Sequence, residues 1–335
     1  MGNPVLVEVT RAQLTESRHR GAVAVVDADG VTVLGLGDVD APVFPRSAIK
    51  ALQALPLLES GAADRFGFGA EELALACGSH SGEPAHLAGV GRMLARAGLA
   101  ESALLCGVHW PFNQEVARAM AREGGKPSAL HNNCSGKHAG FLCAACALGA
   151  DSATYITPDH PVQRTVKAVL EDLSGAAIAD DRRATDGCSV PTWAMPLKGL
   201  ARAFARFGTG QGLTPVRAAA ARRLRAACAE KPWFVAGTDR FCTAVMGHFG
   251  ARAFVKTGAE GVFCAALPER GLGLAVKCDD GGTRAAEVVL AAMLGRLLDL
   301  AEADRAFLEP LARPAIRNWH GIEVGGLRPA AALLE

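Results

Sequence analysis

A serine and a lysine stand three residues apart early in the chain, just after the turn marked by Pro45. Ser47 and Lys50 form an S-x-x-K pattern, and residues 51–59 favour a helix by composition and apolar spacing. Residues three apart share a helix face, which would place the amine against the hydroxyl. In a dry pocket desolvation disfavours the ammonium, and a neutral amine can activate serine as a nucleophile. The ordinary alternative is an N-cap serine followed by a solvated lysine.

Two further stretches carry groups that suit a cleft. An apolar run ends in the small and polar residues 77–83, which include Ser79 and are typical of hydroxyls and backbone amides presented at a cleft. Lys256 follows a predicted strand and precedes a turn with two glycines, Gly258 and Gly261. This position can hold an amine over a cleft, although an edge-strand lysine that blunts strand pairing has the same pattern.

The loop 131–140 is the densest polar cluster in the chain and combines thiol, imidazole, amine and glycine. Cys134 would lie near the positive N-terminus of a following helix, which favours the thiolate. Cys188 is the second candidate, and two thiolates with a nitrogen ligand and water make an open zinc site. From spacing alone the nitrogen is that of His131 or His138, because a lysine must first lose its proton. Two unrelated loop cysteines are the alternative interpretation.

The composition indicates a compact globular protein. Its 335 residues allow one large or two medium domains, and 50% of them are hydrophobic while 21% are charged. A formal net charge of +1 gives no reason to expect a nucleic acid or an anionic membrane as partner. The arginine-rich run 217–225 is typical of the solvated side of an amphipathic helix.

The chain is predicted to be cytoplasmic. Residues 1–13 contain no apolar segment of signal-peptide length, and the longest nearly uncharged apolar run, 139–150, is too short to span a bilayer. The ten cysteines are therefore expected to be mostly thiols. Cys143 and Cys146 form a C-x-x-C inside an alanine-rich helical run, which favours core packing over a redox or metal role.

Apolar runs at both ends of the chain predict strands, and the middle predicts helices. This pattern indicates an α+β fold in which one antiparallel sheet is built from both termini and a helical domain is inserted. The expected domains are 1–45 with 235–335 and 46–234, with the active site at their interface. Strands are expected at 4–9, 22–27, 31–35, 253–256, 261–267 and 271–278, an edge strand at 322–324, and helices at 83–97 and 283–301.

Taken together, these residues resemble the thermolabile, class 3 L-asparaginases of the asparaginase II family. The resemblance covers nearly the whole chain and implies hydrolysis of L-asparagine to L-aspartate and ammonia by a homodimer. It also implies a fold like that of serine β-lactamases and serine-dependent glutaminases. The matching motifs, in order, are Arg46-Ser47-x-x-Lys50, Cys77-Gly78-Ser79-His80, the loop His131 to His138, Asp186-Gly187-Cys188 and Lys256-x-Gly258-x-x-Gly261.

The resemblance also implies roles for particular residues. Two Ser-Lys pairs result, Ser47 with Lys50 and Ser79 with Lys256. The implied zinc ligands include a lysine, which overrules the preference for a histidine. The implied ligands are Cys134, Lys137 and Cys188, and the residues implied near the substrate are Arg46, His80, Asp186 and His138.

The implied mechanism is that of a serine amidohydrolase. Lys50 takes the proton of Ser47, whose oxygen attacks the side-chain amide carbon, and backbone amides hold the oxyanion. Ammonia leaves after protonation, through Ser79 and Lys256, and water hydrolyses the β-aspartyl ester. Spacing does not decide which serine attacks, because the two pairs are nearly symmetric. The zinc ion is expected to position the substrate.

In the substrate, the carboxylate would pair with Arg46 and the amino group with Asp186.

Three other functions fit parts of the same pattern. A serine β-lactamase or penicillin-binding-like acylase shares S-x-x-K, and residues 256–258 spell K-T-G, but the chain has no S-D-N. A glutaminase differs by one methylene in its substrate, which a pocket discriminates only modestly. A zinc- or thiol-based sensor would keep the fold without catalysis.

Overall fold

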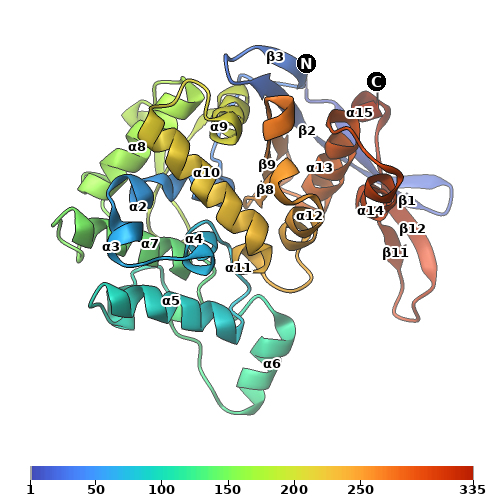
Figure 1. Cartoon of the computed structure of the whole chain (residues 1–335). Coiled ribbons are helices and arrows are strands. Elements are labelled where there is room, and N and C mark those ends of the chain that lie inside the picture. Colours follow the sequence, from blue (N-terminus) through green and yellow to red (C-terminus); the bar gives the residue numbers. More distant parts are fainter. Residues whose placement is uncertain (1, 335) are drawn as a thin grey trace. The chain divides into compact units, whose positions relative to one another are not determined.

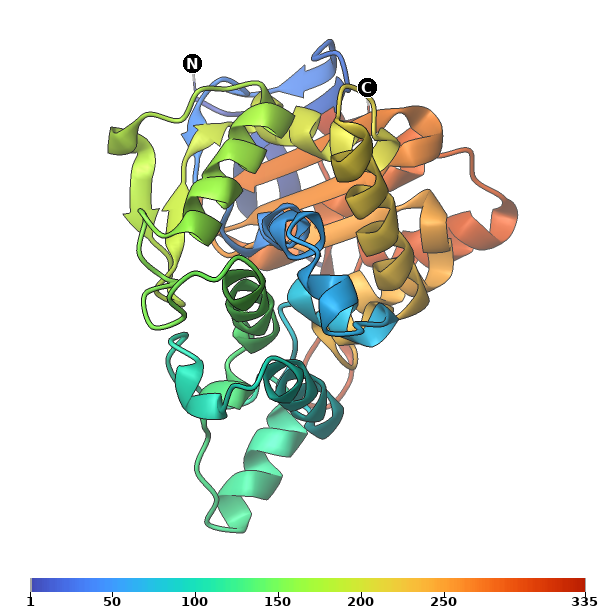
Figure 2. The ribbon, with the colours of Figure 1, turned by 60° about the vertical axis from the view of Figure 1, so that its left-hand side comes forward.

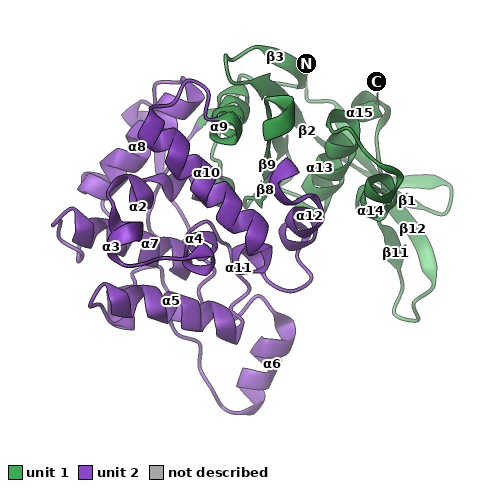
Figure 3. Cartoon of the chain, in the orientation of Figure 1, with its two compact units in different colours: residues 1–48, 195–209, 255–335 green, residues 49–194, 210–254 purple. Residues whose placement is uncertain are grey.

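In the computed structural model, which describes residues 2–334, the chain forms two compact units (Figure 3). The sheet unit comprises the residues up to Ala48, Met195–Thr209 and the residues from Val255 on. The helical unit comprises Ile49–Ala194 and Gly210–Phe254. The chain therefore starts and ends in the sheet unit and enters the helical unit twice.

The sheet unit is built on an eight-stranded sheet in the order β11-β12-β1-β2-β10-β9-β8, with β3 paired to β2. All of its pairings are antiparallel, as expected from the sequence, and the first and last thirds of the chain supply the strands. The strands are β1 (Val5–Arg11), β2 (Leu14–Asp27), β3 (Thr32–Leu36), β8 (Phe254–Thr257), β9 (Val262–Leu267), β10 (Leu272–Cys278), β11 (Ala315–Arg317) and β12 (Glu323–Pro329).

Helices cover this sheet closely. Every residue of β9 is buried, because α9 (Leu197–Thr209) and α13 (Thr283–Leu297) both pack on it (Figures 1 and 2). The glycine at position 273 in β10 lets α9 approach, since a Cβ there would lie 1.9 Å from the carbonyl oxygen of Ala201. A strand buried in this way carries a continuous apolar run instead of an alternating one.

The expected boundaries differ from these units in three places, the first of which is that residues 46–48 belong to the sheet unit. The segment 195–209 belongs to the sheet unit, because α9 packs on β2, β9 and β10. Residues 235–254 belong to the helical unit, where α12 (Phe241–Phe249) packs on α11 (Pro232–Ala236). The order of apolar and helical segments predicted that the chain alternates between two units, but it did not predict on which elements α9 and α12 pack.

One strand that was expected at the edge of the sheet lies inside it. The segment expected as an edge strand at 322–324 is the start of β12, which lies between β11 and β1, so that β11 forms the edge. The polar first half of β2, residues 14–20, has no apolar alternation that would have predicted a strand, and it forms by pairing with β1. The helix expected to reach residue 301 ends at Leu297, and a separate helix α14 (Glu302–Ala312) follows.

The helical unit is arranged around α7 (Ser135–Ala147), whose residues 135–145 are all buried. A helix that is buried on every side needs neighbours on every side, and α2, α3, α4, α5 and α8 all contact it. The other helices are α1 (Lys50–Gln53), α2 (Leu55–Glu59), α3 (Ala62–Arg65), α4 (Ala70–Ala76), α5 (Pro84–Arg96), α6 (Gln114–Arg122), α8 (Pro161–Ser174) and α10 (Pro215–Glu230). Two short strands, β5 (Arg183–Thr185) and β6 (Pro191–Trp193), form a hairpin.

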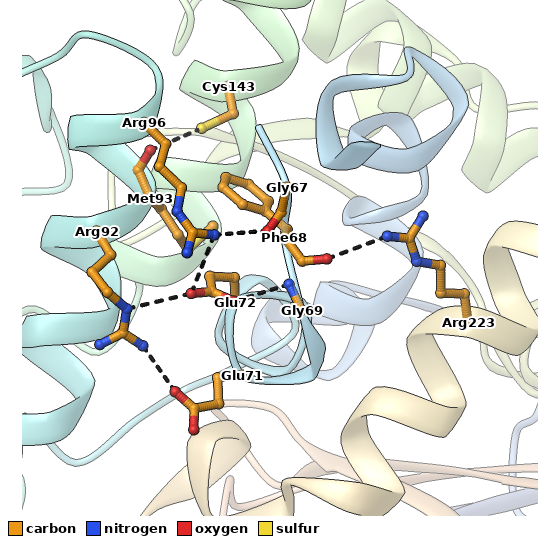
Figure 4. A network of polar contacts seen from close by, with 10 residues as sticks. All are labelled: Gly67, Phe68, Gly69, Glu71, Glu72, Arg92, Met93, Arg96, Cys143 and Arg223. Carbon is orange, nitrogen blue, oxygen red and sulfur yellow. Dashed lines mark hydrogen bonds and ion pairs between the residues drawn. The ribbon is translucent and has the colours of Figure 1, made fainter. Parts of the chain in front are cut away.

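A polar network fixes the start of α4 between two other helices (Figure 4). Glu72 accepts a hydrogen bond from the backbone N–H of Gly69 at 3.0 Å and faces Arg92 and Arg96 of α5. Arg223 of α10 donates to the carbonyl oxygen of Phe68 at 3.3 Å. This anchoring matters for the site, because the chain leaves the other end of α4 toward Ser79.

Of the C-x-x-C pair, Cys143 lies in the core of the helical unit, as expected, and Cys146 is partly exposed. Cys143 is buried and its thiol contacts the carbonyl oxygen of Met93 at 3.6 Å (Figure 4). Burial raises the pKa of this thiol to about 12, so it stays protonated and unreactive.

Of the helices that residues 2–334 form, none combines the length and apolar character that crossing a bilayer requires.

Candidate active site

The amine of Lys50 is completely buried in the helical unit and contacts a serine hydroxyl. Its Nζ lies 2.9 Å from Ser79 Oγ and donates to the carbonyl oxygens of Gly78 at 2.6 Å and Asn133 at 3.3 Å. The serine that contacts Lys50 within the helical unit is thus 29 residues away in the sequence. Spacing along a helix did not predict this contact.

Burial lowers the pKa of Lys50. A charged ammonium is poorly solvated there, and the nearby ammonium of Lys137 lowers the pKa of Lys50 as well, while the thiols of Cys134 and Cys188 act against the shift. A lowered pKa makes the neutral amine accessible at lower pH than for a free lysine. The neutral amine can accept the proton of the hydroxyl that it contacts.

Ser79 is held by its backbone just beyond the end of α4. Its N–H donates to the carbonyl oxygen of Val235 at 2.7 Å, and the residue is 4% exposed. Gly78 permits this close approach, because a Cβ there would lie 2.9 Å from the carbonyl oxygen of Phe234. The side chain of Ser79 is therefore positioned by tight contact between two backbone segments.

In the sheet unit, the turn that carries Ser47 lies against the end of β8. A Cβ at Gly258 would lie 2.7 Å from the carbonyl oxygen of Pro45 and 3.2 Å from the backbone nitrogen of Ala48. Arg46 has a φ of 52°, a left-handed conformation that is uncommon for a residue with a side chain. Strained backbone of this kind clusters at functional sites.

Lys256 is also buried in the sheet unit, at 1% exposure, two residues before Gly258. Its Nζ donates to the carbonyl oxygen of Thr257 at 2.8 Å.

The helix expected after Ser47 forms in pieces. A 3-10 turn spans Arg46–Ile49, α1 follows, and α2 begins separately because Pro56 occupies its first turn.

The two candidate zinc cysteines come together in the helical unit. Cys134 and Cys188 form a thiol pair, and Lys137 Nζ lies 3.0 Å from Cys188 Sγ. All three side chains are buried, at 3 to 4% exposure. Asp186 lies beside them, with its Oδ2 3.1 Å from Cys188 Sγ. The loop before α7 and the turn between β5 and β6 therefore meet, and zinc binding by these residues stays a prediction.

Charges in this cluster, hereafter the thiol cluster, are strongly coupled. The hydrogen bond from Cys188 lowers the pKa of the Cys134 thiol, and the same contact raises the pKa of Cys188. Burial acts to lower the pKa of Lys137, but the two thiols and Asp186 outweigh it and raise that pKa. The cluster thus holds an ammonium against a thiolate, and a metal would have to displace the lysine proton to bind its nitrogen.

Two histidines that were candidates for the substrate site lie inside the helical unit. His80 is fully buried, accepts from the backbone N–H of Gly82 at Nδ1 and contacts Ser135 Oγ at 2.8 Å through Nε2. His138 is fully buried with Nδ1 2.6 Å from the hydroxyl of Tyr155. Burial lowers the pKa of both imidazoles well below its usual range, so both are neutral. Their contact with a substrate stays a prediction.

Sequence reasoning missed two contributors to this region. The backbone carbonyl of Asn133 receives a hydrogen bond from Lys50, and Tyr155 holds His138. Backbone carbonyls leave no signal in a sequence, and Tyr155 stands in a segment without a motif. Within residues 2–334 no three His, Cys, Asp or Glu side chains are arranged to hold a metal ion, so zinc at the thiol cluster would depend on Lys137.

A buried amine on a serine hydroxyl is an arrangement of enzymes that use serine as nucleophile. The chain belongs to the L-asparaginase II family, which matches it over residues 7–329. Membership makes it an asparaginase-like amidohydrolase with a small-molecule substrate. No curated protein matches the chain.

Several solved structures resemble the chain at low identity. Mglu in its glutamate form is 14% identical over 84% of this chain and 62% of its own, with a TM-score of 0.44. A beta-lactamase from Mycobacterium bovis is 16% identical over 83% of this chain and 95% of its own, with a TM-score of 0.39. Simvastatin synthase from Aspergillus terreus is 11% identical over 77% of this chain and 86% of its own, with a TM-score of 0.39. At such TM-scores these likenesses say nothing about function.

Proposed function

We propose that the chain hydrolyses L-asparagine to L-aspartate and ammonia, with a serine nucleophile that Lys50 activates. The observation that carries the proposal is the 2.9 Å contact between Lys50 Nζ and Ser79 Oγ inside a fully buried environment. Family membership supplies the reaction class. The pKa of Lys50, lowered by burial, supports its role as a general base.

The reaction proceeds in two steps. Lys50 accepts the Ser79 proton as Oγ attacks the side-chain amide carbon, and the tetrahedral intermediate expels ammonia once a proton reaches its nitrogen. Water then attacks the β-aspartyl ester, gives up a proton and releases L-aspartate with the serine restored. The backbone N–H of Ser79 is bonded to Val235, so the oxyanion needs other donors.

Ser47 is the second candidate nucleophile, with Lys50 as its base, and Lys256 is then the amine that pairs with Ser79. The strained backbone at Arg46 and the tight contact of Gly258 with residues 45–48 support a role for this turn. In this assignment Ser47 attacks and Ser79 passes the proton to ammonia. Both versions use a neutral lysine, and they differ in which serine carries the ester.

For substrate binding, we assign the α-carboxylate to Arg46 and the α-amino group to Asp186. A guanidinium binds a carboxylate through two parallel hydrogen bonds, and a carboxylate accepts from an ammonium. Arg46→Met and Asp186→Asn should each raise KM more than they lower kcat.

We further propose that Cys134, Lys137 and Cys188 hold a zinc ion. Two sulfur ligands and one nitrogen suit zinc, and the lowered pKa of Cys134 supplies one thiolate in advance. When bound, zinc supplies positive charge that orients a polar substrate. The serine route does not require it as a source of hydroxide.

One assay tests the activity and its rivals. Ammonia release is measured with L-asparagine, L-glutamine and no substrate, with and without chelator, and nitrocefin turnover is followed separately. The proposal expects release from asparagine above all. Faster release from glutamine would make the protein a glutaminase, and nitrocefin turnover without ammonia release would favour the acylase. No turnover of any of them by folded, zinc-loaded protein would favour the sensor.

The nucleophile is identified by trapping. Ser79→Ala should lose about a thousandfold or more of kcat/KM if Ser79 carries the ester. Mass spectrometry of protein quenched during turnover should then find an aspartyl adduct on the peptide that contains Ser79. An adduct on Ser47, together with near-normal acylation of Ser79→Ala, would transfer the role to Ser47.

The resemblance also proposes a cytoplasmic homodimer without a nucleic-acid partner. A molar mass measured by light scattering at micromolar concentration should be twice the 34.7 kDa of the chain. A mass that stays at 34.7 kDa would remove the dimer from the proposal.

A further inference from the structure

The helical unit contains a cavity that shares no residue with Lys50, Ser79 or the thiol cluster. Its volume is about 260 Å³, enough for one small molecule. One wall is α10, and the opposite wall is α12 with the segment that follows it. The lining residues are Arg222, Arg225, Ala226, Ala229, Met246, Gly250, Ala251, Ala253 and Phe254.

One stripe of α10 supplies the charged side of this cavity. The lining residues on α10 are 222, 225, 226 and 229, which are spaced three, one and three apart and so share a single helix face. Two of them are arginines, and none of the nine residues that line the cavity is acidic. The cavity therefore carries positive charge that its own lining does not balance.

Arg225 has a buried polar atom that the fold does not use. Its Nε lies out of contact with solvent and has no hydrogen-bond partner within residues 2–334. Burial lowers the pKa of this guanidinium, and the neighbouring Arg222 lowers it further. Buried polar groups are nearly always hydrogen-bonded, so an orphaned donor at a cavity indicates a missing acceptor.

Two other arginines of α10, unlike Arg225, have acceptors for their guanidinium groups. Arg217 binds Glu59 and Asp172, and Arg223 binds Asp64 and the carbonyl oxygen of Phe68 (Figure 4). The arginine-rich run is thus not the uniformly solvated face that its composition indicated. The fold provides oxygen acceptors for the two arginines that point elsewhere and leaves an unfilled donor at the cavity.

We propose that this cavity binds a small organic carboxylate with an apolar body, of the branched aliphatic or aromatic kind. Two guanidiniums match a carboxylate, which accepts hydrogen bonds from both. The remaining lining residues are apolar or glycine, among them Met246, Ala253 and Phe254, and would contact a hydrocarbon body. Inorganic phosphate or acetate lacks that body, and a neutral aromatic lacks the charge.

The test is calorimetric titration of the full-length, zinc-loaded protein with sodium benzoate. Sodium acetate, inorganic phosphate and benzyl alcohol serve as probes that each lack one half of the ligand. Excess L-aspartate is present throughout, so that benzoate does not report on the substrate site. Binding of benzoate in the millimolar range or tighter is expected, with each of the other probes at least about tenfold weaker.

Three variants locate the binding. Arg225→Met removes the charge while keeping length and helix propensity, and should weaken benzoate at least about tenfold. Arg223→Met, the matched control on the same helix, should leave affinity within about twofold. Ala229→Leu keeps both arginines and fills the cavity, and should abolish binding.

The outcomes decide the proposal in either direction. Equal loss of affinity in Arg225→Met and Arg223→Met would show a diffuse charge effect and overturn it, as would unchanged binding in Ala229→Leu. Absence of benzoate binding to folded wild-type protein would also overturn it. Circular dichroism of each variant confirms folding, and an asparaginase rate within about twofold of wild type in Ala229→Leu separates this result from the proposed catalysis.

Discussion

At the scale of single residues, the buried amine of Lys50 lies within hydrogen-bond distance of the hydroxyl of Ser79. The sequence indicated both residues as candidates, because each stands in a recognisable motif. It paired Lys50 with Ser47, since residues three apart on a helix are neighbours. The contact with Ser79 joins residues 29 apart in the sequence, a separation that local spacing does not encode, and the pairing of Lys50 with Ser47 stays a prediction.

Lys50 gives the first prediction, which concerns pH. Because burial lowers its pKa in the folded protein, kcat/KM should rise with pH as the ammonium loses its proton. The midpoint of that rise should lie below about 10.4, the value of a free lysine. Lys50→Arg should remove both the activity and the rise, because a guanidinium stays protonated. An unchanged pH profile in Lys50→Arg would contradict the role of Lys50 as base.

Arg225 gives the second prediction, which concerns stability. A buried donor without an acceptor costs about 1–3 kcal/mol, so Arg225→Met should raise the free energy of unfolding by up to about 1 kcal/mol. Arg223→Met should instead lower it by up to about 1 kcal/mol, because it loses the contacts with Asp64 and Phe68. Urea unfolding of both proteins measures the difference. A loss of stability in Arg225→Met as large as in Arg223→Met would show that the guanidinium is well satisfied.

At the scale of elements, apolar patterning predicted the buried strands and failed for the exposed ones. β9 and β10 carry apolar runs because helices cover them, and both were expected within two residues of their observed bounds. β11 is short and mostly exposed, the first half of β2 is polar and mostly exposed, and both exist through pairing with their neighbours. Pairing depends on which segments meet, and no local pattern states that.

The end of β8 gives the third prediction. Gly258→Ala should lower the free energy of unfolding by about 1–3 kcal/mol, because the new methyl group would meet the backbone of Pro45 and Ala48. Activity should fall further than the loss of folded protein explains, since the methyl group displaces the turn that carries Ser47. Thermal unfolding and kcat/KM at a temperature where the variant is folded measure the two effects.

A glycine in open space is the control for that experiment. Gly91 lies inside α5, and a Cβ there would have no atom within 4 Å. Gly91→Ala should therefore raise stability by about 0.5–1 kcal/mol and leave the activity unchanged. If Gly258→Ala behaved in the same way, the tight contact with the Ser47 turn would not be needed for activity.

At the scale of the whole molecule, the candidate residues are divided between the units. The sheet unit carries Ser47 and Lys256, and the helical unit carries Lys50, Ser79 and the thiol cluster. Each Ser-Lys pair implied by the resemblance thus takes one member from each unit. The alternation of strands and helices predicted that the sheet unit would come from both termini. It did not predict that α9 belongs to the sheet unit, because the sequence of an amphipathic helix does not indicate which sheet the helix covers.

The thiol cluster gives the last prediction, which concerns the melting temperature. A metal that binds only the folded protein stabilises it in proportion to the logarithm of its concentration over Kd. Here it would join the start of α7 to the hairpin of β5 and β6, two segments that are distant in the sequence. Dialysis against chelator should therefore lower Tm by several degrees, roughly 2–4 °C per kcal/mol for a chain of this size.

Cys134→Ser with Cys188→Ser should give protein with less than about one tenth of the zinc of wild type, and its Tm should no longer respond to chelator. Cys146→Ser is the matched control, because this partly exposed thiol lies on α7 away from the cluster and should leave both the zinc content and the response intact. Full zinc content in the double variant, measured by elemental analysis, would refute the assigned ligands. Loss of zinc without any change in Tm would mean that the hairpin is held by its own packing, so that the metal serves the substrate alone.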